Sequence, residues 1–212
     1  MKIRYFGHSY LLVEGNGYSI ALDPYGEIGL KIPFVKADYL FSSHSHYDHC
    51  NFSAVNASFV VQENSDNFEI IPTYHDDKQG ALRGQNNVLL FTLDGVKLAF
   101  LGDYGEYDNK YLISKLNGVD ILFIPIGGKY TIDSQRAKYY IEQIKPKTVI
   151  PIHYKIKGSN IDIKDVNDFL KLVNEYKIVN SPYQYNQEQG VVVVKPECEE
   201  DLWNIQETIL KN

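Results

Sequence analysis

Long hydrophobic runs, a disulfide framework and a signal peptide are all missing from this sequence of 212 residues. No apolar stretch approaches the roughly 20 residues that a membrane-spanning helix needs. The opening MKIRYFGHSY does not match the pattern of a secretory signal peptide, because no apolar stretch follows its charged residues. Only two cysteines occur, Cys50 and Cys198, and they fit a reducing compartment. We therefore expect a protein that makes no membrane contact and works in the cytoplasm.

An excess of positive charge is also missing. Acidic residues number 27 against 21 basic ones, which gives a formal net charge of −6. Proteins that coat nucleic acid carry basic faces, and this sequence has no run of Lys and Arg. Bulk nucleic-acid binding is thereby excluded, although an acidic chain can still hold an anion where a divalent metal ion supplies the positive charge.

What is present is an ordinary globular composition, with 44% hydrophobic and 23% charged residues. Glycine and proline are spread as turn residues, and no linker, repeat or low-complexity tract interrupts the chain. We expect a single domain over residues 1–212.

Short apolar or alternating runs dominate the first half of the sequence and predict strands. The Asn16-Gly17 pair predicts a hairpin between the second and third runs. The expected strands of this half lie at 3–5, 10–13, 19–22, 39–42, 58–61, 70–73, 88–93 and 97–101.

The second half alternates strands with helices. Strands are expected at 121–126, 148–152 and 191–194, and helical stripes at 137–144 and 166–173. Asp133 or Thr131 is the expected N-cap of the first helix, Pro146 follows it, and the last dozen residues predict a closing helix. This order of elements is typical of a layered α/β domain.

The densest group of chemically active residues is His44-Ser45-His46-Tyr47-Asp48-His49. Three imidazoles and a carboxylate within six residues suit Zn²⁺ or a similar divalent ion. His44 and His46 alternate, so in an extended loop they project to the same side, and Asp48 and His49 can serve a second ion. A polar loop with incidental histidines is the alternative.

Other potential ligands stand just after expected strands. His75 and His153 each end an apolar run, and Asp103 ends the run Ala99-Phe100-Leu101-Gly102. Ligand crevices in layered α/β folds lie outside strand ends, so these groups are expected to converge with the first cluster.

Taken together, the H-S-H-Y-D-H motif, His75, Leu101-Gly102-Asp103 and Ile152-His153-Tyr154 resemble the metallo-β-lactamase superfamily. Gly7-His8-Ser9 and the stretches 124–128 and 146–154 resemble its branch of compact bacterial hydrolases, which includes ascorbate-6-phosphate-lactonase-like proteins. The resemblance implies a four-layer αβ/βα sandwich with a dinuclear site between two sheets.

The resemblance also implies a ligand set. His44, His46 and His75 would bind the first metal ion; Asp48, His49 and His153 would bind the second, and Asp103 would bridge both. At the position of His46, the motif of the oxygen-reducing di-iron relatives resembles a glutamate site. The histidine here therefore disfavours redox chemistry. Two Zn²⁺ ions are the first choice, with Mn²⁺ or Fe as alternatives.

The function implied is hydrolysis of a small ester, lactone or phosphodiester by a metal-bridging hydroxide. Asp48 is the candidate for orienting this nucleophile and moving its proton. The substrate is a small molecule that could be anionic, and a homo-oligomer is compatible with the sequence. A nuclease of the same superfamily and a non-catalytic metal-binding module are the alternatives.

Several residues beside these ligands have two interpretations. One interpretation of His8 is a catalytic-site residue that contacts the substrate or one of the metal ligands. The alternative is a structural histidine that satisfies backbone groups of its loop. Tyr130, Lys129 and Tyr154 are candidates for substrate binding, and a tight turn with a solvated lysine is the alternative at Gly127-Gly128-Lys129. Cys50 is expected to be buried packing, and surface placement is expected for Asp76, Asp77, Glu106 and Asp108.

Overall fold

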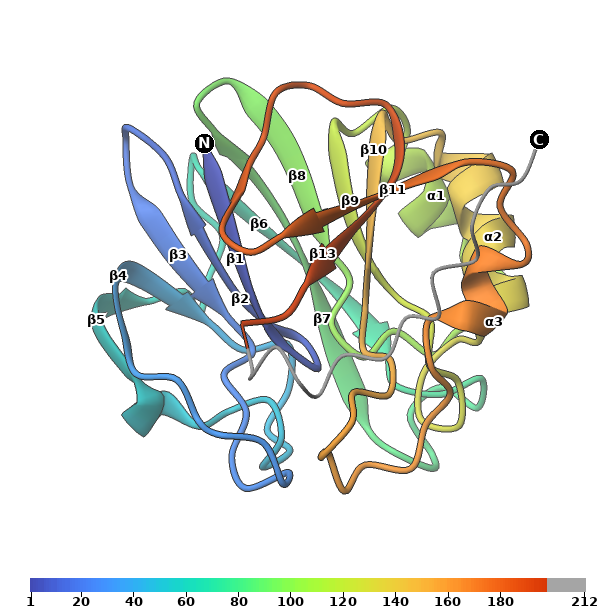
Figure 1. Cartoon of the computed structure of the whole chain (residues 1–212), viewed down its shortest axis with the longest axis horizontal. Helices are drawn as coiled ribbons and strands as arrows, with labels where there is room; N and C mark the ends of the chain where they lie inside the picture. The colour runs from blue at the N-terminus through green and yellow to red at the C-terminus, as the bar shows by residue number, and fades with distance from the viewer. Residues whose placement is uncertain (198–212) are drawn as a thin grey trace.

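Two β-sheets form the centre of the molecule in a computed structural model, which describes residues 1–197 (Figure 1). The six-stranded sheet has the order β12-β1-β2-β3-β4-β5. β2 pairs antiparallel with both β1 and β3, whereas β3, β4 and β5 run parallel. Its strands are Lys2–Gly7 (β1), Tyr10–Glu14 (β2), Ser19–Leu22 (β3), Val35–Phe41 (β4), Val55–Val60 (β5) and Tyr183–Gln184 (β12).

The seven-stranded sheet has the order β11-β13-β10-β9-β8-β7-β6. Strands β8, β9, β10, β13 and β11 are parallel to one another, and β7 is antiparallel to both β6 and β8. Its strands are Phe68–Tyr74 (β6), Gln85–Leu93 (β7), Val96–Phe100 (β8), Ile121–Pro125 (β9), Thr148–Ile152 (β10), Tyr176–Asn180 (β11) and Gly190–Lys195 (β13).

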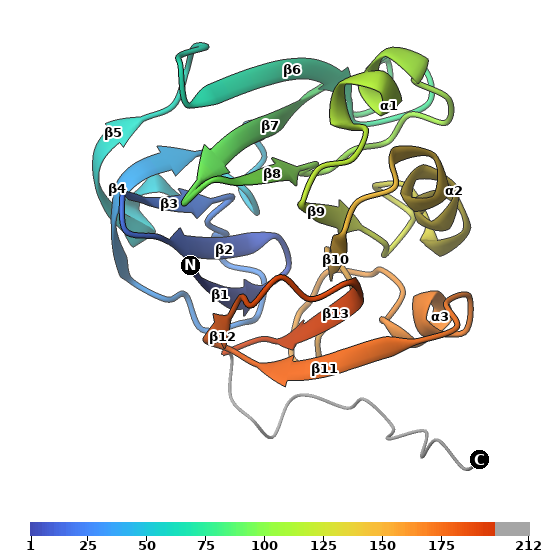
Figure 2. The same cartoon turned by 90° about the horizontal axis from the view of Figure 1, so that it is seen from above.

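The α-helices of residues 1–197 lie along the seven-stranded sheet, on the side away from the other sheet (Figure 2). They are Lys110–Leu116 (α1), Ser134–Ile144 (α2) and Asn167–Leu170 (α3), and a 3₁₀ helix, η1, spans Phe52–Ala54. Sheets and helices are therefore stacked in layers, which confirms the expected α/β sandwich. Every residue of β9 and β10 is buried, as expected for central strands covered on both faces.

The direction of the strands brings the polar strand ends together. β1, β3 and β4 run the same way in one sheet, and β6, β8, β9 and β10 run the same way in the other. The carboxyl ends of strands with a common direction lie at one edge of a sheet. The residues that follow these strands include His8, Asp23, His44, His75, Asp103 and His153.

Most of the predicted elements are present, with boundaries that differ by at most four residues, and two strands, 19–22 and 148–152, match at both ends. The Asn16-Gly17 hairpin is confirmed by the pairing of Glu14 with Ser19. The N-cap of α2 is Asp133, whose carboxylate accepts a hydrogen bond from the Arg136 N–H at 2.9 Å. The expected closing helix lies outside the described residues.

Three further expectations were wrong. The second helical stripe gives only the short α3. The elements α1, β11 and β12 were not predicted, because segments as short as these give no clear hydrophobic period. Cys50 is half-buried rather than buried, and its thiol donates to the Ser45 carbonyl at 3.2 Å. Asp76 is buried rather than on the surface, because it organises the loop that follows β6. No helix of residues 1–197 is long and apolar enough to span a membrane.

Candidate metal centre

The first group of potential ligands joins the loop after β4 to the residue after β6. His44, His46 and His75 each offer a ring nitrogen, and these atoms lie within 4.8 Å of one another. His75 directs Nε2 inward because its Nδ1 is 2.9 Å from the carbonyl oxygen of Tyr130. The Nε2 atom of His44 is buried and has no hydrogen-bond partner in the described chain. A buried donor or acceptor of this kind is costly unless something binds it.

The second group surrounds Asp103, which follows β8. His49 Nε2 is 3.2 Å from Asp103 Oδ1 and 3.7 Å from Asp48 Oδ2. His153 Nε2 is 3.2 Å from Asp103 Oδ2. The same Oδ2 atom lies 3.1 Å from His75 Nε2, in the first group. Asp103 therefore stands between the two groups, as the ligand set implied by the resemblance requires.

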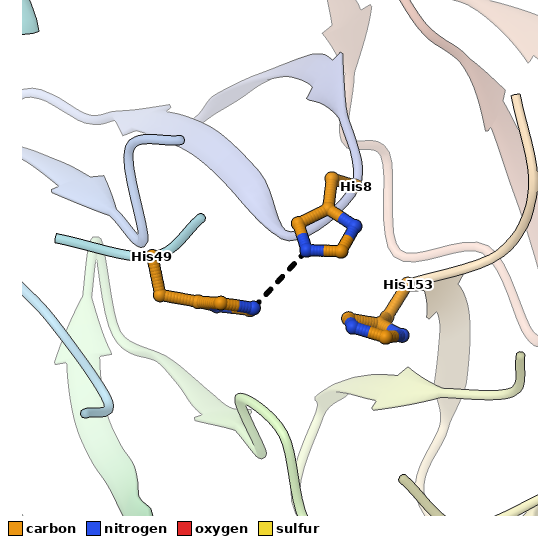
Figure 3. Close-up of side chains that lie close together, drawn as sticks. All are labelled: His8, His49 and His153. Atoms are coloured by element: carbon orange, nitrogen blue, oxygen red, sulfur yellow. Dashed lines mark hydrogen bonds between the residues drawn. The ribbon is translucent and has the colours of Figure 1, made fainter. Parts of the chain in front are cut away.

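His8 belongs to this second group by position. Its Nε2 atom lies 3.1 Å from His49 Nε2 and 3.2 Å from Asp48 Oδ2. The rings of His8, His49 and His153 come from three separate parts of the chain, with ligand atoms within 4.8 Å of one another (Figure 3). The sequence left His8 outside both ligand sets, because only the fold brings the end of β1 beside the loop after β4.

Sequence reasoning missed Asp23. This carboxylate is fully buried after β3 and accepts hydrogen bonds from the Ser43 N–H and hydroxyl, both at 2.6 Å. It also lies 2.7 Å from His49 Nδ1, which fixes the ring with Nε2 facing Asp103. The signal was available, since Asp23 ends an expected strand just as the other candidates do.

Backbone conformation helps aim these side chains. His8, Asp23 and His153 have φ angles of 54°, 44° and 51°, in the left-handed region that non-glycine residues seldom occupy. Each conformation costs of order 1–3 kcal/mol and persists only where the surroundings enforce it. Gly105 is required nearby, because a Cβ atom there would lie 2.4 Å from the backbone carbon of His75.

Burial and charge set the protonation states of the centre. Burial lowers the pKa of His8 to about 3 and that of His44 to about 2. Burial opposes ionisation of Asp103, yet the charges of His153 and His49 hold its pKa well below the ordinary value. Burial likewise opposes ionisation of Asp48, but its hydrogen bond with His8 and the charge of His49 lower its pKa. Burial opposes protonation of His49 and His75 as well, but the Asp103 carboxylate, joined at His49 by Asp23, raises the pKa of both imidazoles. A divalent cation binds neutral imidazoles and ionised carboxylates, so metal binding at these two histidines would release protons.

A cavity of about 680 Å³ opens beside the two groups. Its floor includes His46, Asp48 and Asp103, and its wall includes Tyr130 and Arg83. This volume lies within the range of small-molecule sites.

Two of the predicted substrate contacts lie elsewhere. The ring of Tyr154 is buried against Tyr5, with centroids 6.0 Å apart, and does not line this cavity. Lys129 lines a neighbouring pocket, and its ammonium group pairs with Asp162. The turn at Gly127-Gly128-Lys129 is closed by backbone hydrogen bonds, among them Tyr130 N–H to the Gly128 carbonyl at 2.7 Å. The tight-turn interpretation therefore fits this segment better than an open anion site.

Known proteins are similar to this chain in sequence and in fold. The family model described as beta-lactamase superfamily domain matches residues 2–153. A UPF0173 metal-dependent hydrolase of Geobacillus sp. is 30% identical, over 73% of this chain and 85% of its own. A UPF0173 metal-dependent hydrolase of Carboxydothermus hydrogenoformans is also 30% identical, over 73% and 84% of the two chains.

Solved structures agree with the sequence comparison. A metallo-β-lactamase superfamily protein of Thermotoga maritima has a TM-score of 0.75 and 31% identity, covering 91% of this chain and 97% of its own. Igni18, a metallo hydrolase of Ignicoccus hospitalis, has a TM-score of 0.68 at 23% identity, over 93% and 96% of the two chains, and shows the fold alone. The resemblance inferred from the sequence is confirmed. The chain belongs to the metallo-β-lactamase superfamily, in its branch of compact bacterial metal-dependent hydrolases.

Proposed function

We propose that this hydrolase works with two divalent metal ions held by seven side chains. The observation that carries the proposal is the buried Nε2 atom of His44, which has no hydrogen-bond partner in the described chain although His44 belongs to a group of three histidines. A cation there would satisfy this atom, and a second cation would be held by His49 and His153, whose Nε2 atoms both lie 3.2 Å from the Asp103 carboxylate. The proposed ligands are His44, His46 and His75 for one ion, Asp48, His49 and His153 for the other, and Asp103 for both.

The donor chemistry favours zinc. Imidazole nitrogens and carboxylate oxygens suit Zn²⁺, and Mn²⁺ or Fe can use the same atoms. Among residues 1–197 no thiolate joins the centre, since Cys50 turns its sulfur toward the Ser45 carbonyl. When bound, the ions would supply an activated water as nucleophile and positive charge for the oxygen under attack.

Asp48 is the proposed proton acceptor. It lies on the cavity floor and retains 16% of its side-chain exposure, so it can reach both the centre and a bound substrate. Its lowered pKa keeps it ionised at neutral pH, ready to accept a hydrogen bond from the attacking water. His8 is the proposed positioning residue, because its Nε2–H can donate to Asp48 Oδ2 at 3.2 Å and hold that carboxylate in place.

The substrate that fits is a small ester, lactone or phosphodiester. A cavity of about 680 Å³ accepts a small molecule, with Tyr130 on its wall to contact the part remote from the ions. The acidic charge of the chain disfavours the nuclease alternative. We also propose one domain over residues 1–212, able to act as a homo-oligomer. A cytoplasmic location is consistent with the free thiol of Cys50.

Metal content is the test. Protein purified without chelator or nickel resin should carry about two equivalents of Zn, Mn or Fe. His44→Ala and His153→Ala should each carry less, whereas Asp38→Asn, which changes an exposed carboxylate, should match wild type. No metal, or a single ion unaffected by both histidine variants, would contradict the proposal.

Catalysis is tested on the metal-loaded protein with model esters and bis-p-nitrophenyl phosphate. Turnover that disappears with the metal supports the hydrolase, and full metal loading without turnover on any of them favours the non-catalytic module.

A further inference from the structure

The cavity beside the metal centre has a positively charged wall residue that the proposed chemistry does not use. Arg83 lies on this wall together with Leu82 and Tyr130, while His46 and Asp48 form part of the floor. A molecule that fills the cavity would therefore contact both the proposed metal ligands and Arg83.

Arg83 is a cation without a carboxylate partner. Among residues 1–197 no ion pair involves its guanidinium group. Lys129, which lines the neighbouring pocket, already pairs with Asp162. Burying or half-burying an unpaired guanidinium beside a cavity is unfavourable unless a ligand supplies the negative charge.

Arg83 is also held in place rather than free in solvent. Its guanidinium carbon lies 5.7 Å from the centroid of the Tyr130 ring, at cation–π distance. The Tyr130 carbonyl in turn contacts His75 Nδ1 at 2.9 Å, which ties this wall to a proposed metal ligand.

The loop that carries Arg83 is fixed by one buried carboxylate. Asp76 accepts backbone N–H groups from Lys78, Gly80, Leu82 and Arg83 at 2.8–2.9 Å. Four such contacts preset the backbone of the loop, so little entropy remains to be lost when a ligand binds.

We propose that Arg83 binds a second, anionic group of the substrate, a carboxylate or a phosphate that lies away from the bond being cleaved. The inference rests on the proposed function and narrows its substrate class to small anionic esters. Arginine suits this role because its planar guanidinium can pair with either anion through two hydrogen bonds.

The experiment compares two chromogenic esters, neutral p-nitrophenyl acetate and anionic mono-p-nitrophenyl glutarate. Arg83→Gln should lower kcat/KM for the glutarate ester about 10- to 100-fold, chiefly through KM, and change the acetate ester less than about threefold. Arg83→Lys should recover part of the lost kcat/KM, because lysine keeps the positive charge but lacks the planar guanidinium that forms two hydrogen bonds with one anion. Lys78→Gln is the matched control. Lys78 is a cation of the same loop, but it pairs with Asp77 and does not line the cavity.

Free glutarate and inorganic phosphate, used as competitive inhibitors, tell the two anions apart. The anion whose inhibition constant rises more in Arg83→Gln than in Lys78→Gln is the one that Arg83 recognises. Equal losses on both esters, or no loss on either, would overturn the proposal and leave the hydrolase intact.

The role of Arg83 can be tested separately from the proposed hydrolase activity. If the metal-loaded protein cleaves neither ester, calorimetry with glutarate and phosphate still decides the role of Arg83. Weaker binding in Arg83→Gln than in wild type supports the anion site, and identical binding refutes it.

Discussion

Asp23 offers a sharp test of how the centre is built, through the substitution Asp23→Asn. The carboxylate is fully buried, and Oδ1 accepts only from the Ser43 N–H. Oδ2 faces the Ser43 hydroxyl at 2.6 Å and His49 Nδ1 at 2.7 Å. Because the backbone N–H demands an oxygen, the amide nitrogen of asparagine must replace Oδ2.

The expected consequence is a change of tautomer at His49. An amide N–H2 group donates hydrogen bonds, so His49 Nδ1 must become an acceptor and its proton must move to Nε2. Nε2 is the atom that faces Asp48 and Asp103. A protonated Nε2 cannot coordinate a metal ion, so the second proposed ion loses a ligand while the first keeps all of its histidines.

The size of the effect follows from similar outer contacts in metal proteins, whose removal weakens metal binding about 10- to 100-fold. This corresponds to about 1.4–2.8 kcal/mol in binding free energy. Competition with a chromophoric zinc chelator measures both affinities, and the ¹⁵N shifts of His49 report its tautomer.

Asp38→Asn is the matched control. Asp38 accepts from the N–H and hydroxyl of Ser19 at 2.8 and 2.7 Å, as Asp23 does from Ser43, but contacts no histidine. It should leave both affinities unchanged. A folded Asp23→Asn protein with wild-type affinity for both ions would refute this account of His49.

Three other perturbations have defined outcomes. Asp48→Asn should lower turnover about 100-fold or more, since it removes the proposed proton acceptor. Wild-type turnover with both ions retained would refute this role of Asp48. Asp76→Ala should lower the free energy of unfolding by about 2 kcal/mol in urea denaturation, because four backbone N–H groups lose their acceptor; an unchanged midpoint would show that solvent replaces the carboxylate at no cost. Glu188 tests pH dependence: burial opposes its ionisation, but the hydrogen bond from Tyr183 and the backbone N–H of Asn186 lower its pKa from 4.5 to about 2. A lowered native pKa means that the stabilisation is complete above pH 4.5 and is lost as pH falls toward 2, so Glu188→Gln should cost about 1 kcal/mol at pH 7 and almost nothing at pH 2. Unfolding curves at both values measure this, and a deficit that persists at pH 2 would contradict the assignment.

The sequence alone was enough for the family and for the seven proposed ligands. Six residues, His44 to His49, carry four of the proposed ligands, and a cluster of this density has few structural uses. His75, Asp103 and His153 stand after apolar runs, and periodicity locates such runs well because strand burial follows local composition. The layered α/β class followed from the order of those runs.

The sequence could not place His8, Asp23, Tyr154 or Arg83. Whether a strand-end residue faces the centre depends on strand direction and on which sheet edges meet, and both are set by pairings between distant segments. His8 meets Asp48 across 40 positions, and Tyr154 turns into the core against Tyr5. Local sequence does not predict those contacts, because a single residue with a left-handed backbone conformation changes the direction of a side chain at a strand end.

Chemistry and geometry thus had different sources in this protein. The residue types, fixed by the sequence, determined that divalent metal could be bound, since imidazole and carboxylate groups have that affinity wherever they meet. Only the tertiary structure decided which of them meet, that Asp23 holds His49, and that Arg83 lines the cavity without an ion pair to any of residues 1–197. The physical reason is that ligand identity is a property of single side chains, whereas a site is a set of distances between segments that only folding brings together.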